Sequence, residues 1–491
     1  MGTVFGRIPY KWVVAIVFVF GVFMDLLDTT SVQVAIPTLA REFDATVSQI
    51  EWVVLGYVLS LAIWIPASGW LGDRFGTKRI FLLSVLLFTG ASVLCGEATS
   101  LTQLTVFRML QGVGGGLMIP VGTTMLFRAF PPIERARAST VLMIPTVLGP
   151  ALGPVMGGWF TTHHSWRWIF YVNIPIGIVT FALGVVGLRE HREPSAGRFD
   201  IAGFFLSGAS LAGVLFALSH GPSDGWGAPG VVIPGVLGIV GFVVLVWVET
   251  HIDDPMLALR LLAERMFKVA NVVSFCAYAS FACVTFLMPL FLQDLNGLNA
   301  VESGVTMVPS AIGMVIASQV AGRLYHSIGP RRLILSGLIV MTLVTFSLAT
   351  MSTDSSLWTI RAVMFIRGIA LGLTLVPIQA ASFANVSIAD TGRASSITSV
   401  NRQISASLGV AISGTVLVEA TSHFAGSNAG GAGGIDQATL SGYRAAFFVT
   451  GIVALIATVS GLFVRDRDAS STLRRDVEPE PELDSLLAFE Q

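Results

Sequence analysis

Long apolar stretches alternate with short polar connections along almost the whole chain. Each stretch holds about 20 mostly apolar residues, the length that an α-helix needs to cross the hydrocarbon core of a bilayer. Read to within a few residues, the pattern predicts fourteen membrane-spanning helices, near residues 12–36, 49–70, 80–98, 101–124, 138–160, 168–188, 200–219, 229–249, 269–292, 303–325, 333–352, 357–381, 394–418 and 442–464. The predicted fold class is an all-α polytopic membrane protein.

The composition agrees with a bilayer environment. Of the 491 residues, 53% are hydrophobic and 12% are charged, whereas an ordinary water-facing surface needs about 25% charge. The net charge of -1 argues against a nucleic-acid partner, which would require a basic face. Cys95, Cys276 and Cys283 lie in apolar stretches without metal-ligand spacing, so we expect neither a disulfide nor a metal site.

Basic residues are concentrated on one side of the predicted membrane. If the N-terminus is cytoplasmic, most of the 29 Lys and Arg residues fall in cytoplasmic segments, as the positive-inside rule requires. An even number of spans then places both termini in the cytoplasm. The first stretch has no small-residue cleavage site after it, so we expect it to remain as a span rather than a removed signal peptide. The expected location is the cell (cytoplasmic) membrane.

Three landmarks of the first half recur in the second half in the same order, at offsets of 253 to 259 residues. The pairs are GWLGDRFGTKR (69–79) with GRLYHSIGPRR (322–332), RASTV (137–141) with RASSI (393–397), and RMLQGVGGGLMIP (108–120) with RGIALGLTLVP (367–377). Recurrence of this kind indicates two related halves.

The repeat predicts a plan of six spans, two additional spans and six spans. The expected parts are an N-terminal six-helix bundle over 1–188, two linking helices with cytoplasmic linkers over 189–268, a C-terminal six-helix bundle over 269–464, and an acidic, disordered cytoplasmic tail over 465–491. We expect the chain to work as a monomer.

The segment GWLGDRFGTKR connects spans two and three on the predicted cytoplasmic side. Its glycines allow a tight turn and close helix contact, and Asp73 lies near a helix N-terminus, whose positive end favours an acid. An ordinary basic loop is the simplest interpretation. The order of residues, however, resembles the signature loop of the major facilitator superfamily, which implies closure of the cytoplasmic side by Gly69, Gly72, Asp73, Arg74, Gly76, Lys78 and Arg79. The second copy has His326 in place of Asp73, which implies an asymmetric latch.

The segment LGPALGPVMGGW (148–159) places glycines four residues apart in span five. This spacing lets two helices touch backbone to backbone, and prolines remove helix hydrogen bonds, so a purely structural seam is one interpretation. The segment also resembles the antiporter motif of proton-coupled exporters in the superfamily, which implies export. The matching residues are Gly149, Pro150, Gly153, Pro154, Gly157 and Gly158.

The segment FMDLLDTTSVQVAIPTL (23–39) in span one resembles the first-span motif of the fourteen-helix drug:proton antiporter branch, the quaternary-ammonium and multidrug exporters. Asp28, Thr29, Ala35 and Pro37 match, and Gln33 stands where the motif usually has Asn. The resemblance covers the chain up to about residue 465.

Two acids in span one are the costliest feature of the sequence, because a charged Asp at the bilayer centre costs on the order of 3 kcal/mol. Asp25 and Asp28 are three residues apart, share a helix face, and repel each other when both are charged. Counting at about 1.5 Å per residue places Arg108 on span four at a similar depth. We therefore predict an ion-pair set in which Asp28 couples transport to protons and Arg108 sets the proton affinity of the carboxylate. Asp25 binds a cationic substrate, shares the proton or faces a water-filled cavity. A static salt bridge is the alternative.

The second half lacks a matching acid. Arg367 is the repeat partner of Arg108, but the position equivalent to Asp28 falls near Ser280 and Phe281. Asn401 and Arg402 on span thirteen, with Asp25 and Gln33, are the candidate substrate-binding residues. Arg402 could instead extend its charged end toward the membrane surface.

No motif for covalent chemistry is present: the sequence has no P-loop, no H-E-x-x-H and no G-x-S-x-G. We expect no enzyme, no catalytic residue and no cofactor. The predicted function is proton-driven export of hydrophobic, often cationic, small molecules by alternating access. Export of an endogenous lipid or metabolite is one alternative, and a non-transporting membrane receptor or scaffold is another.

Overall fold

The computed structural model describes residues 8–194, 197–252, 254–353, 355–427 and 434–473. Within these residues the chain forms α-helices and short 3-10 helices, without a β-strand. In chain order the α-helices are α1 (Tyr10–Glu42), α2 (Val47–Phe75), α3 (Thr77–Gly96), α4 (Leu101–Ala129), α5 (Arg135–His163), α6 (Trp168–Tyr171), α7 (Asn173–Gly187), α8 (Ile201–Asp224), α9 (Pro229–Glu249), α10 (Arg265–Asp294), α11 (Ala300–Ile328), α12 (Pro330–Leu348), α13 (Leu357–Ser382), α14 (Thr391–Ser427) and α15 (Gly434–Gly461).

Thirteen helices in the described part of the chain are long and apolar enough to cross a membrane. The protein is therefore a multi-pass membrane protein. The helix α5 is not among the thirteen, although its 29 residues pack along α1. The total of fourteen spans remains a prediction that depends on α5.

The expected span at 168–188, which counts as one of the thirteen apolar helices, is divided into α6 and α7 by a short break at Val172, whose backbone angles remain helical. At the break, the Phe170 carbonyl accepts a hydrogen bond of 2.8 Å from Ser92 Oγ, as a carbonyl within a membrane requires. The break places Asn173 at the first position of α7, where its side chain points into the first half. Apolar periodicity cannot reveal such a break, because both pieces are equally apolar.

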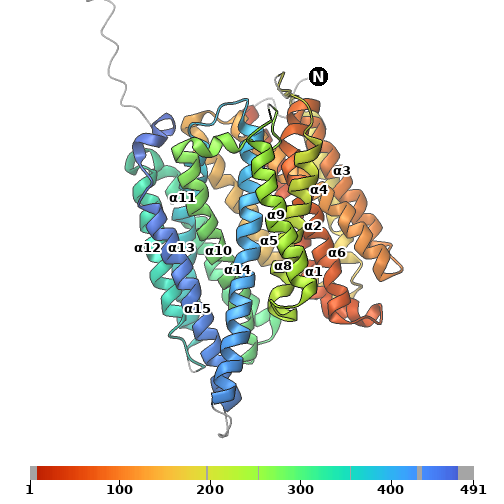
Figure 1. Cartoon of the computed structure of the whole chain (residues 1–491), viewed down its shortest axis with the longest axis vertical. Helices are drawn as coiled ribbons and strands as arrows, with labels where there is room; N and C mark the ends of the chain where they lie inside the picture. The colour runs from red at the N-terminus through yellow and green to blue at the C-terminus, as the bar shows by residue number, and fades with distance from the viewer. Residues whose placement is uncertain (1–7, 195–196, 253, 354, 428–433, 474–491) are drawn as a thin grey trace, which may run out of the picture.

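The two halves repeat the same arrangement of helices. In the first half α1 packs on α5 and α7, α2 on α4, and α3 on α4 and α7. In the second half α10 packs on α14 and α15, α11 on α13, and α12 on α13 and α15. Figure 1 shows the first half in red to yellow and the second half in green to blue.

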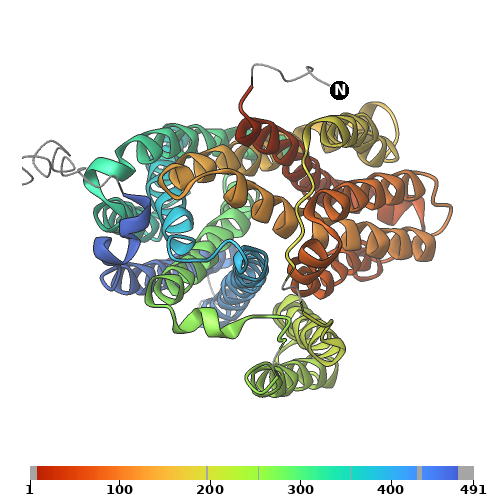
Figure 2. The ribbon, with the colours of Figure 1, turned by 90° about the horizontal axis from the view of Figure 1, so that it is seen from above.

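The helices α8 and α9 form a pair outside both bundles. The helix α8 packs on α2 and α14, and the extensive contact of α9 is with α8. Figure 2 shows this yellow-green pair standing beside the two halves.

The start of α1 and the end of α15 lie at one end of the molecule, at the top of Figure 1. The same end holds the starts of α3 and α10 and the end of α4, which carry Lys78, Arg265 and Arg128. We call it the basic end and the opposite end the far end.

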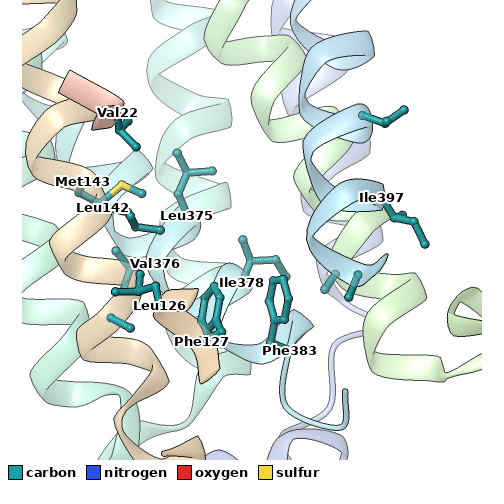
Figure 3. Close-up of a cluster of buried hydrophobic side chains, with 14 of the residues drawn as sticks. Val22, Leu126, Phe127, Leu142, Met143, Leu375, Val376, Ile378, Phe383 and Ile397 are labelled. Atoms are coloured by element: carbon teal, nitrogen blue, oxygen red, sulfur yellow. The ribbon is translucent and has the colours of Figure 1, made fainter. Parts of the chain in front are cut away.

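The two halves share an apolar core near the basic end. Leu126 and Phe127 of α4 and Leu142 and Met143 of α5 meet Leu375, Val376, Ile378 and Phe383 of the second half in one buried cluster (Figure 3). The rings of Phe127 and Phe383 stack with centroids 4.2 Å apart. Contact between apolar side chains of the two halves therefore seals this end.

Corresponding turns of the two repeats have the same geometry. Gly76 and Gly329, which the sequence repeat aligns, both have a positive φ, of 107° and 84°, a conformation that favours glycine. The backbone N–H of Lys78 donates to Glu190 (3.1 Å), and that of Arg331 donates to Asp466 (2.8 Å). Each repeat thus holds the start of its third helix with an acid that follows its sixth.

The first residues of the expected disordered tail are folded, so this part of the prediction is wrong. Residues Asp466–Thr472 form a 3-10 helix, and Tyr325 Oη lies 2.8 Å from Thr472 Oγ1. Asp468 also pairs with Arg265 of α10. These polar contacts, with Ala469 and Thr472 fully buried, fix the segment to the second half. The acidic residues 474–491 lie outside the described part.

Candidate functional site

An ion pair between α1 and α4 lies in the interior of the first half. Arg108 Nη1 is 2.5 Å from Asp28 Oδ2, and both residues are 0% exposed. The two side chains that the sequence placed at a similar depth therefore meet. A buried pair of this kind is costly to break, since loss of one partner leaves an uncompensated charge.

Amide side chains complete the hydrogen bonding of Asp28. Its Oδ1 accepts from Gln111 Nε2 (3.0 Å) and from Asn173 Nδ2 (2.8 Å). Arg108 donates further to Gln111 Oε1 (2.7 Å) and to the Val53 carbonyl (3.2 Å). Four helices, α1, α2, α4 and α7, thus position one carboxylate.

Asp25 occupies a neighbouring but separate position, 4% exposed. Its Oδ1 accepts a hydrogen bond from Tyr57 Oη. The Tyr57 ring also lies under the Arg108 guanidinium, 4.3 Å from ring centroid to Cζ. Tyr57 therefore links Asp25 to the arginine that pairs directly with Asp28.

Three residues of this cluster were not predicted from the sequence: Tyr57, Gln111 and Asn173. A signal for Gln111 existed, because it follows Arg108 by three residues and so shares its helix face. Nothing in the local sequence singled out Tyr57 or Asn173, since their roles depend on contacts between helices.

The equivalent place in the second half has no carboxylate partner for Arg367 among the described residues. Arg367 is 1% exposed and donates to the carbonyls of Ser280 (3.3 Å) and Phe281 (3.2 Å). These are the two residues that the repeat aligns with Asp28. Backbone carbonyls therefore replace the acid.

A cavity lined mostly by polar residues, which we call the central cavity, lies between the halves. Its walls come from α4, α10, α13 and α14, and include Thr123, Asn271, Tyr278, Gln379, Asn401 and Arg402. Two of the four predicted substrate-binding residues, Asn401 and Arg402, line it. The other two are elsewhere: Asp25 is in the buried cluster and Gln33 is on an exposed part of α1.

The signature loop forms a contact between the halves at the basic end. Asp73, 4% exposed, accepts from Arg128 Nη2 (2.9 Å), and Arg128 also donates to the Ile388 carbonyl (3.1 Å). A carboxylate oxygen of Asp73 lies 3.0 Å from the place where a Cβ of Gly392 would be. Asp73 therefore faces the start of α14. We had expected it to face the start of the helix that follows its own loop, and this expectation was wrong.

The other residues of the signature loop differ in their contacts and exposure. Gly69 lets α2 meet α14, since an added Cβ would lie 2.8 Å from the Gly392 carbonyl oxygen; its N–H donates to Ser396 Oγ (3.2 Å). Lys78 Nζ donates to the carbonyls of Val185 and Leu188. A Cβ on Gly72 would meet its neighbours only at ordinary van der Waals distances. Arg74 and Arg79 are exposed.

The glycine run of α5 packs directly on α1. Thr30 Oγ1 donates to the Gly149 carbonyl (3.2 Å), and Ser31 Oγ donates to the Gly153 carbonyl (3.0 Å). A Cβ on Gly157 would lie 2.7 Å from the Ser31 carbonyl oxygen, whereas one on Gly158 would meet Val34 only at 3.9 Å. The seam holds α1, which carries Asp25 and Asp28, against the helix at the interface between the halves.

This difference between neighbouring glycines gives a matched test. Gly157→Ala should destabilise the protein by about 1–3 kcal/mol through overpacking. Gly158→Ala should be neutral or stabilising, because alanine favours helix by about 1 kcal/mol. Thermal unfolding in detergent measures both, and equal Tm values would contradict the close contact.

Comparison with known proteins places this chain in one family. Residues 18–410 match the sequence profile of the Major Facilitator Superfamily. A protein named "Multidrug resistance protein B homolog" from Mycobacterium tuberculosis is 34% identical over 410 residues, covering 82% of this chain and 75% of that protein. A "Putative multidrug resistance protein MdtD" from Serratia proteamaculans is 31% identical, covering 83% and 84%. The chain belongs to the Major Facilitator Superfamily; it is a transporter and not an enzyme.

Solved structures agree on the fold. The human organic anion transporter MFSD10 superposes with a TM-score of 0.64 at 14% identity, over 92% of this chain and 99% of that chain. The proton:xylose symporter XylE superposes with a TM-score of 0.62 at 13% identity, over 92% and 94%. At these identities the likeness concerns the fold alone.

Proposed function

We propose that this protein exports hydrophobic, often cationic, small molecules across the cytoplasmic membrane in exchange for protons, by alternating access. The observation that carries the proposal is the buried Asp28–Arg108 pair. Arg108 has a titratable partner, whereas Arg367, its counterpart in the second half, donates hydrogen bonds only to carbonyls among the described residues. The multidrug names of relatives at 31% to 34% identity support the substrate class.

The pair supplies a physical reason for coupling. Protonation of Asp28 removes the negative charge but leaves its amide neighbours in place. Arg108 is then a buried cation without its direct counter-charge, which is costly in a site of low polarity. Movement of the helices that hydrates or re-pairs Arg108 becomes favourable. The proton can shift the two-state equilibrium only by its affinity difference between the states; a hundredfold difference corresponds to about 2.7 kcal/mol.

Orientation follows from charge. We propose that the basic end faces the cytoplasm, with both termini there, because loops near Lys78, Arg128 and Arg265 carry the positive charge that marks the inner side. The structure, sealed at the basic end, would then be the state closed to the cytoplasm. Asp28 is sealed from solvent in it, so proton exchange requires another arrangement of the halves.

The central cavity is the proposed substrate site, with Asn401 and Arg402 in its wall. We propose that transport needs no cofactor, since the proton gradient is the energy source. We also propose that the functional unit is a monomer.

Substrate-stimulated proton flux tests the proposal. The purified chain, reconstituted in liposomes containing a pH-sensitive dye, should move protons when a lipophilic cation is added. Flux only with lipids or a metabolite would replace drug export by export of an endogenous compound. Absence of flux with every solute would favour a receptor or scaffold and overturn transport.

A further inference from the structure

An apolar groove lies between the α8–α9 pair and the second half. Its walls are Ser210, Leu211 and Val214 of α8; Ile239, Phe242, Val243, Leu245 and Val246 of α9; Leu257, Leu259 and Leu262 of the following linker; Asn271 and Phe275 of α10; and Ile397, Val400, Asn401 and Ile404 of α14. The groove is distinct from the central cavity, which lies between the halves.

The groove and the central cavity share two residues, Asn271 and Asn401. Asn401 Nδ2 donates to the Asn271 carbonyl (3.0 Å), and Asn271 Nδ2 donates to the Phe267 carbonyl (2.9 Å). Asn271 is 7% exposed, and its Oδ1 has no hydrogen-bond partner among the residues that the structure describes. A buried polar atom without a partner is costly, so this position favours a ligand that brings a polar group to it.

Both ends of the groove are closed while its side is open. At the far end, Trp226 Nε1 donates to Thr415 Oγ1 (2.9 Å) and ties the α8–α9 pair to α14. At the basic end, the linker covers the groove and Arg260 pairs with Asp390 (2.8 Å). Ile239 and Val243 belong to α9, an apolar helix long enough to cross a membrane, and remain 60% and 64% exposed.

We infer that the groove is a lateral entry site through which an amphipathic small molecule dissolved in the basic-end leaflet reaches the central cavity. The apolar body of the molecule lies between α9 and α14, and its polar head meets the Asn271–Asn401 pair, the shared wall of groove and cavity. The additional helices α8 and α9 thereby form one side of a membrane-facing port. This inference rests on the proposed export function.

Filling the groove tests the inference. Val243→Trp adds bulk inside it, and Leu237→Trp, on the same helix at 66% exposure and outside the lining residues, adds the same bulk elsewhere. The probes are a trimethylammonium ion with a long alkyl chain and tetramethylammonium, which does not partition into lipid. Val243→Trp should raise the KM for the long-chain probe about tenfold and leave that for tetramethylammonium within twofold. Leu237→Trp should change neither.

The possible outcomes separate the two proposals. If wild-type protein transports neither probe, the export function fails. If the wild type transports the long-chain probe and Val243→Trp behaves like Leu237→Trp, or affects both probes equally, lateral entry is overturned. Ile239→Trp provides a second groove-filling variant, which must reproduce the selective KM rise if Val243→Trp does not fold.

Discussion

Arg108→Gln should abolish proton-driven transport and destabilise the protein. The substitution leaves the fully buried Asp28 with amide donors but without a counter-charge. Removing one partner of a buried ion pair costs about 3–5 kcal/mol. Thermal unfolding in detergent should show a clearly lower Tm, whereas Arg41→Gln, at an exposed position near the end of α1, should leave the Tm unchanged.

The double variant Asp28→Asn with Arg108→Gln separates coupling from a static salt bridge. Two neutral amides remove both charges, so the Tm should recover most of the loss. Proton-driven transport should stay absent, because no titratable group remains at the pair. Recovery of proton-driven transport together with stability would mean that the pair only fixes helix positions.

Asp73→Asn should open the basic end. It removes the charge that holds Arg128 and faces the start of α14. A hydrogen bond to a charged group contributes about 2 kcal/mol, so its loss should shift the equilibrium between closed and open states about 30-fold. The substitution should change the equilibrium between closed and open states and leave the buried Asp28–Arg108 pair intact.

Thiol accessibility measures this shift. A cysteine introduced at Ser399, in the wall of the central cavity, is labelled with a membrane-impermeant maleimide from the basic side, in a background without the three native cysteines. Labelling should be faster in Asp73→Asn than in Arg74→Gln, a change at the exposed neighbouring residue. Equal rates in the two variants would contradict a gate at Asp73.

Periodicity and repeats predicted the parts of this protein that depend on the local sequence. Apolar runs located the long helices, and the recurrence of GWLGDRFGTKR anticipated that Gly76 and Gly329 share a backbone conformation. Counting residues from the ends of the spans predicted that Asp28 and Arg108 pair, because helices that cross the same membrane rise by the same length per residue.

The remainder depends on packing between distant segments, which a single sequence does not report. Asn173 of α7 reaches Asp28 of α1 from a position 145 residues further along the chain. Asp73 faces a helix that begins at Thr391, more than half the chain away. The acidic composition of the tail does not reveal that residues 466–472 fold onto α12 and α10, because this depends on the contact of Asp466 with the start of α12.

The most direct test of the central claim is pH-gradient-driven uptake of a cationic dye into inside-out vesicles, measured beside gradient-free counterflow, for wild type, Asp28→Asn and Asp294→Asn. Asp294 is the acid at the far end of α10, the repeat partner of α1. We predict that Asp28→Asn loses gradient-driven uptake and keeps counterflow, while Asp294→Asn keeps both. Unchanged gradient-driven uptake in Asp28→Asn would contradict the coupling role of the buried carboxylate.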